Sequence, residues 1–335
     1  MAQALESDPD VEMILGMGRR EPTVPLERTE YVRADQTYSI LSRIVSATQV
    51  DTVVHTFLVD STQASGRALH EMNVIGTMNL LAACGQVGSP VRHVVVKSST
   101  IVYGSSPRDP YYFREDHQRP SSPATRLERS LIEVESLVRD FAEDNPGTLV
   151  TVLRFANVLG TNIVTPISAN LSRRLVPVIA GFDPLIQFVE EDDVVRCLEH
   201  VTRNRVGGLF NVAGDGRMTW HEILHVCRAV PLPLPDVGTA LVASPLVRLG
   251  IIDFPPELES LLRFGRGVDT TRLKRTGFTF RFTTAGAVHS FMAAVRLRRG
   301  LGSEPAAYTF EQDVEQFFRH SPAVVNRTGE TAPTS

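Results

Sequence analysis

The feature that most constrains the fold is the apolar run Val94-Val95-Val96, which leads into the hydroxyl-bearing residues of segment 97–104. Apolar residues stand there at consecutive positions instead of alternating with polar ones. A strand of that kind is buried on both faces, as in a parallel sheet that helices cover on both sides. The hydroxyl groups then lie at the carboxyl end of the strand, the edge at which parallel sheets bind ligands.

Strand-like and helix-like segments alternate along the first half of the chain. Short β-branched runs mark the strands, and apolar residues at helical spacing mark the helices. The expected strands are residues 11–17, 31–33, 52–57, 93–98 and 149–154, and the expected helices are 38–49, 67–84 and 126–143. This alternation predicts a doubly wound α/β domain around a parallel sheet.

The second half of the chain is less regular. Prolines become frequent after Gly160 and cluster at residues 231–235. We expect a helix over 193–203, a strand over 209–213 and a helix that begins after Thr219. The predicted division is a first domain over residues 1–164, a smaller lobe over 165–300 with segments that return to the first domain, and a polar, largely disordered tail over 301–335.

Charge and cysteine content narrow the class of protein. The net charge of −4 favours neither nucleic acid nor an anionic membrane surface as a partner. No apolar run reaches the ~20 residues that a membrane-spanning helix needs, and residues 1–6 do not resemble a signal peptide. Three scattered cysteines do not make a disulfide framework. We therefore expect a cytoplasmic protein with no nucleic-acid and no membrane partner.

Several segments carry a family resemblance. Residues 94–104 are similar to the fifth strand and catalytic-serine loop of the extended short-chain dehydrogenase/reductases, the NAD-dependent epimerase/dehydratase family. Residues 153–160 resemble the family segment beside nicotinamide and substrate, and residues 269–278 resemble its closing segment. Lys97 and the loop over residues 102–110 look like those of an atypical actinobacterial subgroup, whose members are similar to UDP-glucose 4-epimerase. The resemblance implies a Rossmann-like dinucleotide-binding domain over 1–164 and a substrate lobe over 165–300.

The usual front end of this family is missing from the sequence. The family begins with a strand, a Gly-x-x-Gly-x-x-Gly loop and a helix whose N-terminus holds the pyrophosphate. The early glycine pair Gly16-Met17-Gly18 is followed by Pro22 and Pro25, which prevent a helix. Residues 11–17 are therefore better interpreted as the second strand. We expect a truncated reading of a longer chain, whose start lies ~25–30 residues upstream.

The resemblance implies an NAD or NADP cofactor at the carboxyl ends of the strands. Arg19 and Arg20 follow the expected second strand, where an arginine suits the 2′-phosphate of NADP and an acid suits NAD. They favour NADP, while ordinary surface arginines in an Arg-rich chain would give the same pattern. The other cofactor residues that the resemblance implies are Asp35, Gln36, Thr56, Phe57, Leu58, Asn73, Ser98 and Phe155.

Substrate residues are implied in the same way. Thr100 and Asn157 match positions beside the substrate. Epimerases often carry an arginine for the diphosphate of a sugar nucleotide, but residues 184–187 hold none, so Arg266 or Arg263 is the expected substitute. The implied substrate is a nucleotide sugar or a related polyol, and a homodimer is compatible with the resemblance.

The catalytic centre departs from the family pattern. In the family a serine or threonine binds the substrate hydroxyl, a tyrosine transfers the proton, and a lysine four residues later lowers the pKa of the tyrosine. The serine role falls on Ser99, but the other two positions fall on Leu127 and Leu131. The Tyr-x-x-x-Lys pair is absent from the sequence. Tyr111 and Tyr112 are candidate replacements for the missing tyrosine. The alternative is that they only anchor their loop.

Two functions from different classes fit these features. The first is an NAD(P)-dependent epimerase/dehydratase-like oxidoreductase with an atypical site. The second is a catalytically silent dinucleotide-binding protein that serves regulation or assembly.

Two further patterns could suggest a metal site. Residues 221–225 fit the zinc-protease motif His-Glu-x-x-His, and residues 190–193 are all acidic. The first lacks a convincing third ligand, and we expect an ordinary helix that Thr219 caps. The second is expected to begin a helix, since carboxylates are favourable at a helix N-terminus. We therefore expect no metal.

Overall fold

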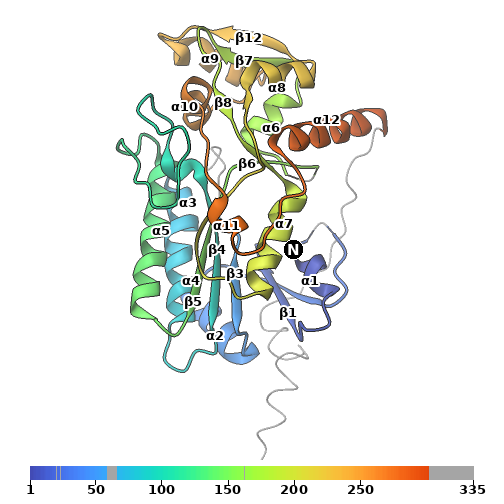
Figure 1. The fold of residues 1–335 in the computed structure, drawn as a ribbon. Coiled ribbons are helices and arrows are strands. Elements are labelled where there is room, and N and C mark those ends of the chain that lie inside the picture. The colour runs from blue at the N-terminus through green and yellow to red at the C-terminus, as the bar shows by residue number, and fades with distance from the viewer. Residues whose placement is uncertain (20, 23, 59–65, 162, 302–335) are drawn as a thin grey trace, which may run out of the picture.

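The computed structural model describes residues 1–301 except 20, 23, 59–65 and 162 (Figure 1). At its centre is a parallel sheet with the strand order β10-β5-β4-β3. These strands are β3 (Thr52–His55), β4 (His93–Ser99), β5 (Leu149–Phe155) and β10 (Gly208–Val212). The predicted α/β class and parallel sheet are confirmed. Arg20 and the predicted tail lie outside the described residues, apart from Leu301.

Helices cover both faces of this sheet, as the apolar run in β4 predicts. Val94 and Val96 pack against one layer of helices, and Val95 packs against the other. The first layer contains α2 (Tyr38–Thr48), α3 (Gly66–His70), the π-helical segment Glu71–Ile75, α4 (Gly76–Cys84) and α5 (Arg126–Asp144). The second layer contains α7 (Glu191–Arg203), on the other side of the strands in Figure 1.

Two more parallel strands form a separate sheet. β1 (Ile14–Gly18) pairs with β2 (Thr29–Arg33), and α1 (Ala2–Glu6) contacts both. Among the described residues no strand pairing joins this sheet to β3. A cavity of about 1030 Å³ lies between the β1–β2 sheet and β3. Leu15 of β1 and Val54 of β3 are among its lining residues. The parallel array is therefore divided where a doubly wound sheet has its first strand.

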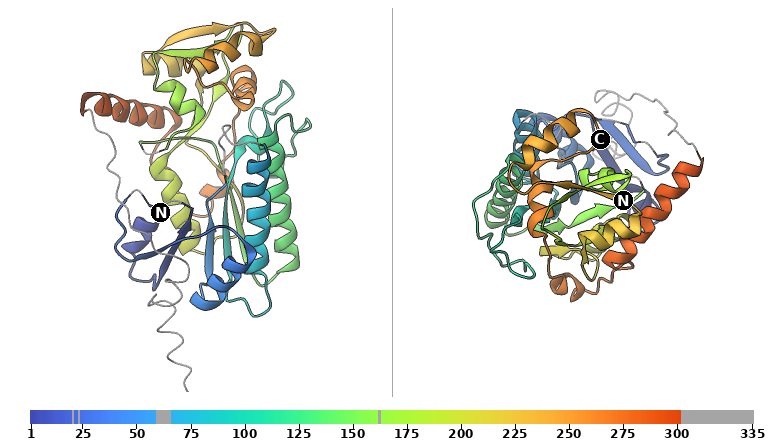
Figure 2. Two further views of the ribbon diagram at one scale, coloured as in Figure 1. Left: turned by 180° about the vertical axis from the view of Figure 1, so that it is seen from behind. Right: turned by 90° about the horizontal axis from the view of Figure 1, so that it is seen from above.

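The C-terminal lobe surrounds a core of its own, which includes Phe188, Trp220 and Leu261. Figure 2 shows the lobe beyond one end of the central sheet. Its strands are β6 (Asn157–Leu159), β7 (Leu175–Ile179), β8 (Leu185–Ile186), β9 (Phe188–Glu190), β11 (Met218–Thr219) and β12 (Val230–Leu234). Its helices are α6 (Pro166–Leu171), α8 (Trp220–Cys227), α9 (Thr239–Arg248), α10 (Pro256–Phe264) and α12 (Thr284–Leu301). β10 and α11 (Thr271–Lys274) return to the central sheet.

The proline cluster at 231–235 is more regular than the sequence suggested. Most of it forms β12, which pairs in parallel with β7. The amide of Val230 donates to Arg174, and the carbonyl of Leu234 accepts from Ala180. The intervening Pro231 and Pro233 therefore face away from β7, where the missing N–H groups disrupt no pairing.

Candidate functional site

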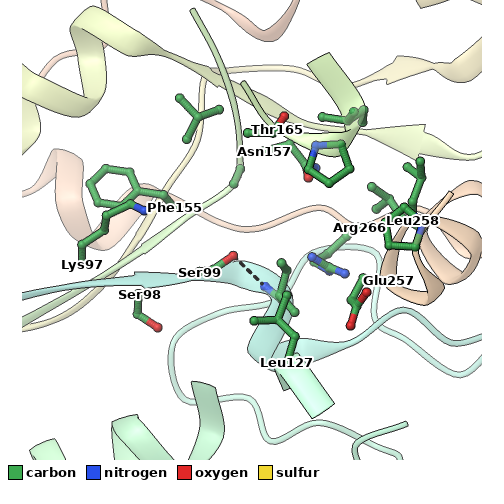
Figure 3. Close-up of a pocket in the computed structure, with 17 residues that line it drawn as sticks. Lys97, Ser98, Ser99, Leu127, Phe155, Asn157, Thr165, Glu257, Leu258 and Arg266 are labelled. Carbon is green, nitrogen blue, oxygen red and sulfur yellow. Dashed lines mark hydrogen bonds between the residues drawn. The ribbon is translucent and has the colours of Figure 1, made fainter. Parts of the chain in front are cut away.

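A pocket lies where the carboxyl ends of β4 and β5 meet α6 and α10 of the lobe (Figure 3). Parallel strands end at one edge of their sheet, so this is the edge at which the sequence analysis expected a ligand. The pocket brings together the predicted residues Ser98, Ser99, Phe155, Asn157 and Arg266. Leu127, Leu258 and Leu261 supply much of its apolar wall.

Ser99 offers a hydroxyl to this pocket. Its Oγ accepts a hydrogen bond of 3.2 Å from the Ile101 amide and so caps the short helical turn Thr100–Tyr103. No acceptor for the Ser99 proton occurs among the described residues, so the hydroxyl is free to donate to a ligand. Thr100, which was predicted to bind substrate, is 3% exposed within that turn and is not among the lining residues.

Ser98 is engaged by a polar network beneath the pocket. It donates to Glu135 of α5 at 2.5 Å, and Nε of Arg154 donates to the same carboxylate at 3.0 Å. Nη1 of Arg154 donates to the hydroxyl of Tyr103 at 2.7 Å, and that hydroxyl donates to Asn211 at 2.8 Å. The side chains of Arg154 and Glu135 are only 12% and 13% exposed. The network fixes the end of β4, and with it the position of Ser99.

Arg266 brings a buried positive charge into the pocket. It follows α10 and is 8% exposed. Its Nε donates to the Gly104 carbonyl at 2.7 Å and its Nη2 to Ser105 Oγ at 3.1 Å. Burial lowers the pKa of Arg266 to about 10, so the guanidinium remains charged at neutral pH. Of its five N–H groups, those not used in these bonds can bind an anion such as phosphate.

Lys97 and Glu257 also line the pocket, and the sequence analysis assigned a role to neither. Oε2 of Glu257 is buried without a hydrogen-bond partner among the described residues, and the charge of Glu257 stabilises the Arg266 guanidinium. In Figure 3 Glu257 and Arg266 lie together, while Lys97 lies beside Phe155. Two features of the sequence could have drawn attention to these residues. Lysine is rare in this chain, which holds only Lys97 and Lys274, and Glu257 directly follows Pro255-Pro256, a pair typical of a helix start.

Leu127 and Leu131 lie near the start of α5, at the positions aligned with the missing tyrosine and lysine. Leu127 lines the pocket and is 4% exposed. Leu131 is 2% exposed and packs in the core between α5 and the sheet. This wall can exclude water and contact a ligand, but an aliphatic side chain cannot transfer a proton.

Tyr111 and Tyr112 are not among the pocket-lining residues. The guanidinium carbon of Arg217 lies 3.7 Å and 4.4 Å from the centroids of their rings. Nη1 of Arg217 also donates to the Tyr111 carbonyl at 2.8 Å. The structure thus brings both rings to Arg217 and not into the pocket with Ser99, an arrangement typical of loop anchors.

Residues predicted for the adenosine end of the cofactor gather at the carboxyl ends of β1 and β2. Nε of Arg19 forms a 3.3 Å ion pair with Asp35 on the exposed surface. The carbonyl of Gln36 accepts a 2.9 Å hydrogen bond from Asn79. An acid and an arginine therefore stand side by side at the place where one favours NAD and the other favours NADP.

The remaining cofactor candidates follow β3 or lie on the π-helical segment. Thr56 lines the cavity between the two sheets. The ring of Phe57 lies against that of His55, with centroids 3.9 Å apart and an interplanar angle of 31°, and Leu58 is buried. Asn73 donates to Ser130 Oγ at 3.1 Å. They approach the sheet edge but do not line the pocket around Ser99.

The predicted cofactor residues fall into two groups. Arg19 and Asp35, predicted for the adenosine end, form their ion pair after β1 and β2, while Ser98 and Phe155 line the pocket. After β1, the described part of the chain has no glycine-rich turn that opens a helix at that strand's carboxyl end, where a pyrophosphate would bind.

The two patterns that could suggest metal have structural roles. Thr219 caps α8, and Glu222 accepts from the Thr219 amide at 2.8 Å in a capping box, as expected for an ordinary helix. Glu190 caps α7, whose first turn holds the other three acids. Among the described residues no group of three or more His, Cys, Asp or Glu side chains could hold a metal ion. Within the same residues, no helix has both the length and the apolar character to cross a bilayer.

The fold and the pocket define the protein as a Rossmann-like α/β protein with a ligand site at the carboxyl edge of its sheet. The family model described as "NAD dependent epimerase/dehydratase family" matches residues 1–213. The chain belongs to this family. An uncharacterized protein of Mycobacterium tuberculosis is 33% identical over 300 residues, which cover 89% of this chain and 76% of that protein.

Characterised relatives are more distant. UDP-glucose 4-epimerase of Yersinia pestis is 31% identical over 127 residues, 37% of this chain and 36% of that enzyme. The structure of UDP-glucuronic acid 4-epimerase from Bacillus cereus in complex with NAD has a TM-score of 0.68 at 14% identity, covering 88% of this chain and 94% of that one. The structure of MoeE5 in complex with UDP-glucuronic acid and NAD also has a TM-score of 0.68, at 20% identity. That match covers 89% of this chain and 94% of MoeE5. These structural likenesses confirm the fold.

Proposed function

We propose that the chain is an NAD(P)-dependent epimerase/dehydratase-like oxidoreductase whose substrate is a nucleotide sugar. The observation that carries this proposal is the buried Arg266 guanidinium in one pocket with the Ser99 hydroxyl. A nucleotide sugar presents both a diphosphate and ring hydroxyls, which match these two groups. The titles of similar structures, which name UDP-glucuronic acid or UDP-glucose with NAD, support this substrate class.

Each pocket residue has a separate proposed role. Arg266 binds a phosphate oxygen, Asn157 contacts the sugar, and Ser99 donates to the hydroxyl at the reacting carbon. The cofactor supplies a hydride acceptor when bound, with Arg19, Asp35 and Phe155 among the residues that hold it. Arg19 suits the 2′-phosphate of NADP, while its ion-pair partner Asp35 suits the ribose hydroxyl of NAD, so the proposal covers both cofactors.

Proton transfer needs a group other than the usual tyrosine. Lys97 and Glu257 are the pocket residues that can give up or accept a proton at Nζ or Oε2, whereas arginine does not deprotonate. We propose that one of them takes the proton of the hydroxyl that Ser99 holds.

A second candidate is the catalytically silent dinucleotide-binding protein. The observation that favours it is the aliphatic pair at the Tyr-x-x-x-Lys positions, Leu127 and Leu131. Such a protein would retain binding through Arg266 and lack turnover.

Binding of UDP tests the part of the proposal that both candidates share. Isothermal titration with UDP should give an affinity about 10- to 100-fold lower for Arg266→Gln than for the unmodified chain, because a charged hydrogen bond is lost. Arg298→Gln, an exposed change on α12, is the matched control and should bind normally. Equal affinity in all three proteins would contradict the assignment of Arg266.

A further inference from the structure

Exposed aliphatic side chains gather at the tip of the C-terminal lobe, around α9 and β12 (Figure 1). Val237, Leu241 and Leu249 are 88%, 82% and 73% exposed. The helix buries only Thr239 and Ala243 completely, so most of its surface faces outward. Figure 2 likewise shows this part of the lobe at the end of the molecule away from β1 and α2.

The aliphatic composition of this tip is compatible with a lipid partner and differs from that of a typical protein interface. Its large exposed side chains are Val, Leu and Ile, without aromatic residues on α9 or β12. Protein interfaces draw most of their affinity from Trp, Tyr and Arg in fitted pockets, while Leu and Val are under-represented at such positions. Protruding aliphatic chains are instead suited to insertion among lipid headgroups and acyl chains.

Arginines border the tip. Arg248 ends α9, Arg174 directly precedes β7, and both are exposed. Arg173 donates to the Gly250 carbonyl at 2.9 Å, just beyond the helix. The acids of this part of the sequence are Asp236, which pairs with Arg263 at 2.9 Å, and Asp253, which follows the buried Ile252. Arginines outnumber acids along this rim, and the excess positive charge complements an anionic surface, while an isologous contact between two copies would bring that excess together.

The edge of β12 also opposes strand addition by a second copy. Pro231 and Pro233 occupy the positions that face away from β7, and neither has an N–H group to donate. A sheet that continues across two molecules therefore cannot form regularly at this edge.

We propose that the tip formed by Val237, Leu241, Val247, Arg248, Leu249 and Ile251 docks on an anionic lipid surface. The side chains would enter the headgroup region while the arginines contact anionic headgroups. Neither the net charge nor the search for a spanning helix predicted this contact, because it depends on one local surface and needs no spanning segment. In this orientation the lobe would rest on the membrane, and the pocket would lie on the side of the lobe that meets β4 and β5.

Vesicle co-sedimentation tests the proposal with the 335-residue chain. Vesicles of phosphatidylcholine mixed with phosphatidylglycerol should bind the protein at low salt, and vesicles of phosphatidylcholine alone should bind it less. The double variant Leu241→Ser, Leu249→Ser should lower the affinity for the anionic vesicles at least about tenfold, since two exposed apolar side chains no longer insert. Both positions are exposed, so the fold should survive, and circular dichroism checks this.

The matched control is Val87→Ser, a fully exposed aliphatic residue between α4 and β4, which should bind as the unmodified chain does. No binding to anionic vesicles, or equal binding by the double variant, would overturn the proposal. So would a concentration-dependent dimer that the double variant abolishes without any vesicle binding, because the tip would then be an interface between copies.

Discussion

Ser98 and Ser99 are adjacent in sequence but meet different surroundings, because successive side chains of β4 point to opposite sides. Ser98 donates to the half-buried Glu135, whereas the Ser99 hydroxyl accepts from the Ile101 amide at the pocket wall. We expect Ser98→Ala to lower the free energy of unfolding by about 1.5–3 kcal/mol, as for a lost hydrogen bond to a charged group. Urea denaturation measures this change.

Ser99→Ala should cost less stability, about 0.5–1 kcal/mol for the lost cap on the turn Thr100–Tyr103. It should lower turnover on a nucleotide sugar about 10- to 100-fold, since one hydrogen bond to the reacting hydroxyl is removed. Equal effects of the two substitutions on both quantities would contradict the different roles assigned to these serines.

His55 gives the fold a pH dependence at the residue scale. It is 1% exposed, its Nε2 lies 2.8 Å from Thr77 Oγ1, and burial lowers its pKa from 6.5 to about 4. The native state therefore keeps His55 neutral, while the unfolded chain takes up a proton below pH 6.5. This contribution is fully present above pH 6.5 and is lost as the pH falls toward about 4.

At about pH 5 the expected loss from this residue is roughly 2 kcal/mol of unfolding free energy relative to neutral pH. The comparison is urea unfolding of the unmodified chain and His55→Gln at both pH values. The variant should show a smaller decrease, and an identical pH dependence in both proteins would contradict the assignment.

At the scale of elements, Gly265 determines how the chain leaves α10 and enters the pocket. Its φ is +69°, and a Cβ there would overlap the Leu185 carbonyl oxygen. The next residue is Arg266, whose amide donates to that same carbonyl at 3.2 Å. We expect Gly265→Ala to destabilise the protein by about 1–3 kcal/mol and also to weaken UDP binding, because Arg266 must shift.

Gly181→Ala is the matched control, since its φ is +86° and no atom lies within 4 Å of the added Cβ. It should share the backbone strain without loss of UDP affinity. If both variants bound UDP equally well, the link between Gly265 and the position of Arg266 would be wrong.

Elements with an unambiguous pattern were predictable from the sequence. β4 follows from the apolar run Val94-Val95-Val96, β5 from a run rich in Val and Leu, and α5 from its helical spacing. β12 was missed because prolines normally argue against a strand, and only the direction of their missing N–H groups makes them tolerable there.

The pocket was predictable only in part, because some of its residues are brought there by tertiary packing. Ser99 and Asn157 belong to recognisable segments, whereas Glu257 reaches the pocket through tertiary packing of α10. The engagement of Ser98 by Glu135 depends on the packing of α5 against β4, which sequence patterns do not specify.

At the scale of the whole molecule, the division of the parallel array predicts uneven stability. β1 and β2 form a two-stranded sheet beside a cavity of about 1030 Å³, whereas β4 is paired on both sides. Two-stranded sheets are marginal by themselves. In hydrogen-exchange mass spectrometry we expect amides of β1 to exchange much faster than those of β4. Equal protection would show that the two sheets open as one unit.

The central claim is that a nucleotide sugar reacts in the pocket of Ser99 and Arg266. Its most direct test is to incubate the 335-residue chain with UDP-glucose or UDP-glucuronic acid, with NAD or NADP added, and to separate the products by chromatography. The account predicts a C4-epimerised or oxidised sugar nucleotide, which Ser99→Ala loses and Arg298→Gln retains. UDP binding through Arg266 with no conversion of either sugar under any of these conditions would contradict it and favour the catalytically silent protein.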